Sequence, residues 1–217
     1  MMKTRRRIVQ LELREYQKKD FKALETIIRE TWHYDAFTSP RTAIKLARVF
    51  LSSCLTNYTF SRVAVVDGNV VGVILANNIA KHKCPLSNRL LQVKSIISLY
   101  SSKEGRSVSK IFGNVNGIDK QLLNENNNIY QAELALFAVS SSCRGKGIGK
   151  MLFQSTLDYM KQEKLKNFYL FTDTSCNYGF YEHQGMKRRL EKKHIFNIKG
   201  QQAVMNFFIY DYQNITS

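Results

Sequence analysis

One segment in the second half of the chain restricts the fold more than any other. An apolar run, Leu134 to Val139, is followed by the turn Arg144-Gly145-Lys146-Gly147-Ile148-Gly149 and by helical apolar spacing from Lys150 onwards. This order is typical of a buried strand, a glycine-rich loop and a helix in direct succession. Glycines let a backbone approach a ligand closely, and the first amides of a helix are unpaired and partly positive. The segment therefore predicts an anion site, to which the arginine and lysine of the turn add positive charge.

Two familiar phosphate-binding motifs do not fit this turn. A nucleotide P-loop requires Gly-Lys-Ser/Thr, whereas Met151 follows Lys150, and a dinucleotide fingerprint requires glycines spaced differently from these. The spacing Arg-x-x-Gly-x-Gly, from Arg144 to Gly149, resembles instead the loop of the GNAT superfamily of acyl-CoA N-acyltransferases. In that family the strand, loop and helix bind the pyrophosphate of coenzyme A, so the resemblance implies a CoA site here.

A second block strengthens the resemblance. The segments 168–174 and 177–186 look like the family's fifth strand and the helix that ends in Tyr-Glu-x-x-Gly-Phe. Met186 replaces the usual aromatic residue, and Asn177 lies closer to Tyr181 than the commonest family spacing would place it. The amino-terminal half matches only in the order of its elements, and residues 77–128 are not explained by the resemblance.

The resemblance implies an α/β (α+β) fold with a mixed, mostly antiparallel central sheet of six or seven strands flanked by helices. A weakly alternating strand from Ile8 to Leu13, a helix after Asp20 and a helix starting at Ser39-Pro40 fit this order. The turn Asp67-Gly68-Asn69 between two apolar runs predicts a hairpin. We expect one domain over residues 1–217, with residues 77–128 as a helical insertion between the third and fourth strands.

The insertion is basic and has its own helical patterning. Between Lys81 and Lys110 it holds seven Lys or Arg residues and one Glu, so it is either a lid over an anionic ligand or a solvated insertion. Its helices, around 90–99 and 108–123, are interrupted at Ser101-Ser102 and at Glu104-Gly105. After it, the run from Ile129 to Val139 predicts a central strand that is buried on both faces, with residues 132, 134, 136 and 138 on one of them.

Composition excludes some classes and leaves the partner open. Hydrophobic residues make up 44% and charged residues 23% of the chain, which indicates a folded globule. The longest apolar run, Val70 to Ala76, is too short to cross a bilayer, so we expect a cytoplasmic protein without a membrane partner. The net charge of +16 is compatible with nucleic acid, acidic lipid or a phosphorylated cofactor, and equally with a role in solubility.

The four cysteines and four histidines show no metal-ligand spacing, so no metal is expected. Cys143 and Cys176 adjoin the proposed site and would be the candidates for an acyl-cysteine intermediate. Neither has an adjacent His or acidic residue that would activate it, which favours reduced, unreactive thiols.

Acyl transfer to an amine requires a proton acceptor, and the leaving thiolate benefits from a proton donor. Glu133, in the central strand, is a candidate general base because burial would raise its pKa; it can equally be a strand-end carboxylate paired with a lysine. Tyr181 resembles the family's general acid, against the alternative of an aromatic residue packed in the core. The resemblance implies direct attack in a ternary complex.

The expected partners are acetyl-CoA as cosubstrate and an amine-bearing acceptor, and a homodimer is left open. The residues expected to bind the cofactor are Phe137, Ala138, Val139, Arg144, Gly145, Lys146, Gly147, Ile148, Gly149, Lys150 and Asn177. In the family the acceptor pocket is built from the first two helices and variable loops, so residues 77–128 are expected to shape it. The net charge mildly disfavours a polycationic acceptor.

The alternative is a non-catalytic protein of the same fold that senses CoA or binds nucleic acid. Its best candidate surface is the basic run of Lys187, Arg188, Arg189, Lys192 and Lys193. A solvated strand and turn explains the same run more simply.

Overall fold

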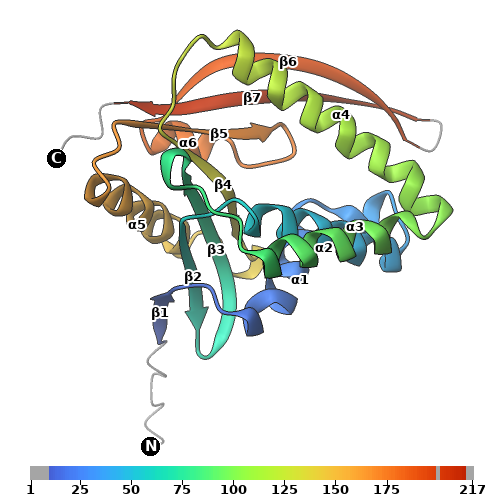
Figure 1. The fold of residues 1–217 in the computed structure, drawn as a ribbon, viewed down its shortest axis with the longest axis horizontal. Coiled ribbons are helices and arrows are strands. Elements are labelled where there is room, and N and C mark those ends of the chain that lie inside the picture. The colour runs from blue at the N-terminus through green and yellow to red at the C-terminus, as the bar shows by residue number, and fades with distance from the viewer. Residues whose placement is uncertain (1–9, 199–200, 214–217) are drawn as a thin grey trace, which may run out of the picture.

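The computed structural model describes residues 10–198 and 201–213, with a seven-stranded sheet at its centre (Figure 1). The strand order is β1-β2-β3-β4-β5-β7-β6, in which β4 and β5 are parallel and the other neighbours antiparallel. The strands are β1 (Leu11–Arg14), β2 (Phe60–Val66), β3 (Asn69–Asn78), β4 (Ala132–Val139), β5 (Asn167–Asp173), β6 (Lys187–Ile198) and β7 (Gln201–Gln213). The expected mixed, mostly antiparallel α/β architecture is confirmed.

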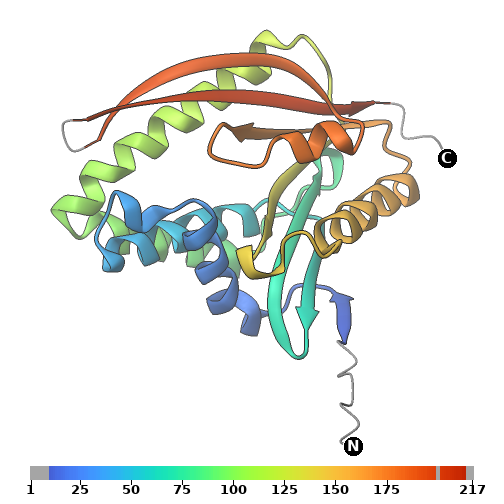
Figure 2. The same ribbon diagram turned by 180° about the vertical axis from the view of Figure 1, so that it is seen from behind.

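Helices cover both sides of this sheet. They are α1 (Phe21–Thr31), α2 (Pro40–Leu55), α3 (Leu86–Tyr100), α4 (Lys103–Glu125), α5 (Ile148–Gln162) and α6 (Gly179–His183). Figures 1 and 2 show α1, α2 and α3 on one side of β2 to β4 and α5 on the other, while α4 leads away from α3 towards β6 and β7. In the described part of the chain, no helix combines the length and the apolar character needed to cross a bilayer.

The local signals for the first hairpin and for the second helix are confirmed. Asp67 and Gly68 have positive φ angles of 48° and 81°, as the tight turn between β2 and β3 requires. The Ser39 hydroxyl accepts a hydrogen bond from the Thr42 amide at 3.4 Å, and Pro40 occupies the first position of α2.

Several strand ends differ from their expected positions. Ile129 is 90% exposed and lies outside β4, which begins three residues later, so the expected start of this strand is wrong. The strands β6 and β7 form a long hairpin of twelve and thirteen residues at the edge of the sheet. Ile8 and Val9 of the expected first strand lie outside the described residues.

The break in the insertion lies at Ser101-Ser102 and not at Glu104-Gly105. The Ser102 hydroxyl accepts a hydrogen bond from the Gly105 amide at 3.1 Å and so caps α4, which already begins at Lys103. A Cβ atom at Gly105 would lie 1.9 Å from the carbonyl oxygen of Leu99. Glycine therefore serves the close approach of α3 and α4 and does not interrupt a helix.

A bulge in β4 overturns the expected strand faces. The register between β3 and β4 shifts so that Ala135 is left without a partner residue. Ala132 and Leu134 pack into the core on the α5 side, whereas Leu136 and Ala138 pack against α1 and α2. The strand is also not fully buried on both sides, because its remaining side chains are only half-buried along a cleft.

Candidate active site

A cleft of about 990 Å³ opens where β4 and β5 separate. These parallel strands pair at only two positions, Ala132 with Phe168 and Glu133 with Tyr169. Both strands continue beyond these pairs, so the gap between them widens towards their carboxyl ends. The cleft is lined by both strands, by the glycine-rich turn, and by parts of α2, α4 and α6.

The glycine-rich turn presents free backbone amides at one end of this cleft. Gly145 and Gly147 have φ angles of 76° and 79°, a left-handed conformation that favours glycine. The amides of Ile148, Gly149 and Lys150 form the first turn of α5 and have no hydrogen-bond acceptor among the described residues. Because the helix dipole also places partial positive charge here, the turn is suited to bind an anion.

Nine of the eleven residues expected to bind the cofactor line this cleft. They are Phe137, Ala138, Val139, Arg144, Gly145, Gly147, Gly149, Lys150 and Asn177. Lys146 and Ile148 do not line it: the Lys146 amine donates to the Ser142 carbonyl at 2.9 Å, and the Ile148 side chain is buried in the core. The exposed Lys146 amine lies beside the turn outside the cleft lining, and of Ile148 only the backbone is available to a ligand.

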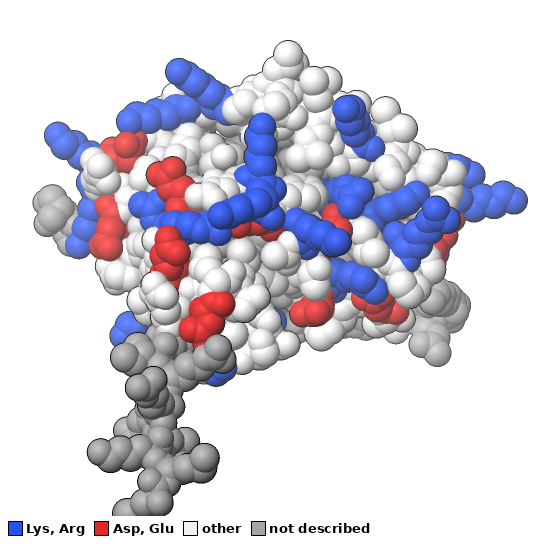
Figure 3. Space-filling model, turned by 90° about the horizontal axis from the view of Figure 1, so that it is seen from below, with Lys and Arg blue, Asp and Glu red and all other residues white. Residues whose placement is uncertain are grey.

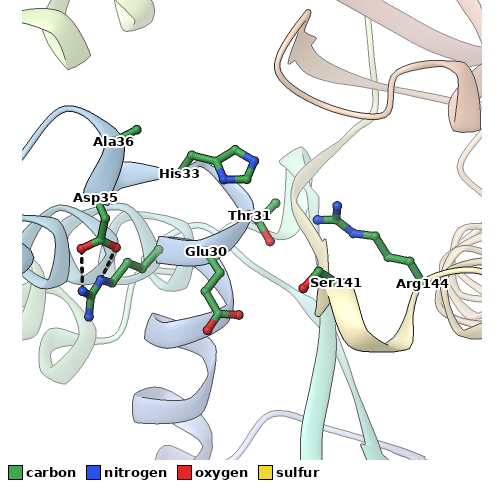
Figure 4. Close-up of a pocket in the computed structure, with 8 residues that line it drawn as sticks. Glu30, Thr31, His33, Asp35, Ala36, Ser141 and Arg144 are labelled. Atoms are coloured by element: carbon green, nitrogen blue, oxygen red, sulfur yellow. Dashed lines mark hydrogen bonds and ion pairs between the residues drawn. The ribbon is translucent and has the colours of Figure 1, made fainter.

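Arg144 carries positive charge across the mouth of the cleft. Its Nε donates to the Val139 carbonyl oxygen at 3.3 Å. Figure 4 shows its side chain reaching from the turn towards the end of α1, into a second cavity of about 370 Å³. Thr31, His33 and Arg144 line both cavities, so the smaller cavity continues the cleft beyond the turn.

Glu133 lies at the opposite end of the cleft. Its carboxylate accepts a hydrogen bond from the Asn57 side chain at 3.3 Å, and the Tyr169 hydroxyl also bonds to it. Asn57 in turn accepts from Asn77 at 3.0 Å. Burial raises the pKa of Glu133 above its ordinary value, and the bond from Tyr169 offsets part of that rise. Among the described residues no lysine pairs with Glu133, which removes the strand-end ion pair as an explanation.

Tyr181 also lines the cleft, from α6. Its ring lies 6.3 Å from that of Phe137 and 5.7 Å from that of Phe180, centroid to centroid. Burial is the largest cause that raises the pKa of Tyr181, so the phenol is protonated at neutral pH. Tyr181 is therefore packed against other aromatic rings and also lies in the cleft with a phenolic proton that it could donate.

Two acidic residues that sequence reasoning missed also line the cleft, Asp119 of α4 and Asp173 at the end of β5. Neither belongs to a motif. The only pattern that pointed to Asp119 was its place in the insertion expected to shape the acceptor pocket. With Glu133, they bring three acidic side chains to the lining of the cleft.

Cys176 is not activated. Burial raises the pKa of Cys176, which lines the cleft, to about 11, so it is a neutral thiol. Cys143 does not line the cleft. Within residues 10–198 and 201–213, no group of three or more His, Cys, Asp or Glu side chains is arranged to hold a metal ion.

The basic run proposed as a nucleic-acid surface is largely engaged in ion pairs on β6. These pairs are Arg188 with Glu182 and Glu191, Arg189 with Asp211, and Lys192 with Glu125. On the face shown in Figure 3, basic side chains outnumber acidic ones, but acidic side chains lie among them. These contacts favour a solvated strand over a nucleic-acid surface.

Known proteins share both the turn and the fold. Residues 120–186 match the acetyltransferase (GNAT) family, a range that contains β4, the glycine-rich turn, α5 and the Tyr181 segment. The N-acetyltransferase from Staphylococcus aureus Mu50 is similar to this chain, with 14% identity, a TM-score of 0.56, and coverage of 95% of this chain and 99% of that one. The ribosomal-protein-alanine N-acetyltransferase from Brucella melitensis has 14% identity, a TM-score of 0.54, and coverage of 93% and 99%. No curated protein sequence matches the chain.

At such low identity the structural neighbours establish the fold alone. Together with the family match, they confirm the resemblance that the sequence indicated: this chain has the GNAT acetyltransferase fold and carries the family's characteristic segment.

Proposed function

We propose that the protein is an N-acetyltransferase that transfers an acetyl group from acetyl-CoA to a primary amine by direct attack in a ternary complex. One arrangement carries the proposal: Gly149 and Lys150, whose backbone amides are free, line the same cleft as Glu133 and Tyr181. On this proposal residues 1–217 act as one acyltransferase domain, and residues 77–128 form the acceptor side of the cleft.

The diphosphate of CoA binds at the turn, where the amides of α5 and the side chain of Arg144 supply donors. The thioester arm then lies along β4 towards Glu133. From Val139 to Glu133 the strand spans roughly 20 Å, which suits a long, extended cosubstrate. The widening gap between β4 and β5 supports this path, because it leaves the edge of β4 without a partner strand.

In the reaction the amine nitrogen attacks the thioester carbonyl carbon, the C–N bond forms and the C–S bond breaks. Glu133 takes a proton from the amine, directly or through a water molecule, and Tyr181 donates its phenolic proton to the departing thiolate. The raised pKa of each group supports these roles: Glu133 becomes a stronger base, and Tyr181 stays protonated until the thiolate forms. The reaction needs no acyl-cysteine, in keeping with the neutral thiol of Cys176.

A scan of primary amines with acetyl-CoA, followed by release of free thiol, tests the proposal. We expect turnover with at least one amine, and a loss of about 10² to 10⁴ in kcat for Tyr181→Phe. Tyr178→Phe is the matched control, because this tyrosine is in the same segment but does not line the cleft, and it should retain activity.

Binding of CoA without turnover of any amine, together with an unchanged Tyr181→Phe variant, would sink the enzymatic proposal. The CoA-sensing alternative would then be the better account. If CoA itself did not bind, neither the enzymatic proposal nor the CoA-sensing alternative would hold.

A further inference from the structure

We propose that Asp119 binds a second positive charge on the acceptor, so that the substrate is a dicationic amine with its reacting nitrogen at Glu133. This inference rests on the proposed function and adds the chemical class of the acceptor to it. It concerns the insertion helix α4, which the resemblance to the family does not explain.

Asp119 is held in the cleft without a partner. It is half-buried on α4, in a stretch of the wall that also contains Phe112, Val115 and Leu123. No hydrogen bond or ion pair to its carboxylate occurs within the described ranges of the chain. Lys120 lines the same wall but forms no ion pair with it. An unpaired carboxylate in such a place is costly unless a cation joins it.

The groups around Asp119 make this end of the cleft negative. Burial is the main cause that raises the pKa of Asp119 to about 7, and the charges of Asp173 and Glu133 raise it further. All three of these residues line the cleft. A bound ammonium group would reverse these effects and keep Asp119 ionised.

One uncharged group in the cleft wall points to a missing partner independently of the carboxylates. Among the described residues, the buried side-chain atoms without a hydrogen-bond partner are Asn77 Oδ1 and Thr172 Oγ1. Asn77 does not line the cleft, so only Thr172 bears on a ligand there. Thr172 is 7% exposed, lines the cleft beside Asp173, and has only the weakly bonding Cys176 thiol as a neighbour. The Thr172 hydroxyl can accept a hydrogen bond as well as donate one, and an ammonium group supplies donors.

The cleft lining holds both signs of charge: Arg144 and Lys150 lie at the glycine-rich turn, whereas Glu133 and Asp119 lie on other elements, with Lys120 next to Asp119. The net charge of +16 disfavours a polycationic acceptor at long range. Inside the cleft the local groups outweigh it, because their charges act over shorter distances and with less screening.

The experiment compares 1,4-diaminobutane with pentylamine, which has the same number of heavy atoms but one charge. We measure kcat and KM for each with acetyl-CoA in the wild type, in Asp119→Asn, and in Asp158→Asn, an exposed carboxylate of α5 outside the cleft. The wild type should prefer the diamine at least tenfold in kcat/KM. Asp119→Asn should lower that preference about tenfold or more, through the KM for the diamine, while Asp158→Asn should behave like the wild type.

Equal use of both amines by the wild type, or an unchanged preference in Asp119→Asn, overturns the inference and leaves the proposed function intact. If neither amine is turned over, calorimetric titration of 1,4-diaminobutane into wild type and Asp119→Asn in the presence of CoA still decides. Weaker binding to the variant supports the subsite, and equal binding or no binding to either protein overturns it.

Discussion

Glu133 shows how one residue's surroundings set its chemistry. It lies in the short stretch where β4 still pairs with β5, and its half-buried side chain lines the cleft. Asn57 and Tyr169 hold the carboxylate in place, and Asn77 holds Asn57. Burial and orientation together fit a base that must take a proton from a defined position.

We predict that Glu133→Gln lowers kcat/KM for an amine by about 10² to 10⁴. In the wild type kcat/KM should fall as pH decreases through the raised pKa of Glu133, because the protonated carboxyl cannot accept a proton. The variant should lack this acid limb in a pH–rate profile. An identical limb in the variant would assign the titration to another group.

Glu133→Gln should also change how the free energy of unfolding depends on pH. Since the pKa of Glu133 is higher in the folded than in the unfolded chain, the wild type loses stability as pH rises through the folded value. Glu133→Gln does not titrate. Its stability relative to the wild type should therefore increase with pH over that window, which denaturant unfolding at several pH values can measure.

At the scale of elements, the two faces of α3 should contribute differently to the free energy of unfolding. Leu99 is 3% exposed and packs into the core with α1 and α2, whereas Leu90 is 51% exposed. Leu99→Ala should lower the free energy of unfolding by about 2 to 5 kcal/mol. Leu90→Gln should change it by less than about 0.5 kcal/mol in the same chemical-unfolding measurement. A large loss from Leu90→Gln would mean that the outer face of α3 is covered.

Elements with local signals were predictable, and those set by pairing were not. The capping Ser39 and the turn at Asp67 and Gly68 act within a few residues, so the start of α2 and the hairpin could be located from the sequence. The bulge at Ala135 depends on how β4 meets β3, and strict alternation of apolar residues conceals it. Strand faces therefore needed the structure.

At the scale of the whole molecule, the two ends of the cleft differ in the same way. The proposed diphosphate site lies in one continuous segment from β4 to α5, so the sequence alone could point to it. The proposed acceptor site joins Asp119, Glu133 and Asp173 from three elements with Asn57 from a fourth part of the chain. No spacing rule connects these residues, because only the packing of α4 against the far strands brings them together.

The two-residue contact between β4 and β5 has a mechanical meaning. It divides the sheet into two parts, β1 to β4 and β5 to β7. Within the described residues, the strands of these two parts pair only at these two positions. A long cosubstrate bound in the gap would contact both parts of the sheet and hold them at a fixed separation. Binding of the cosubstrate would then fix the width of the cleft where the acceptor is proposed to bind. The cosubstrate would therefore bind before the acceptor.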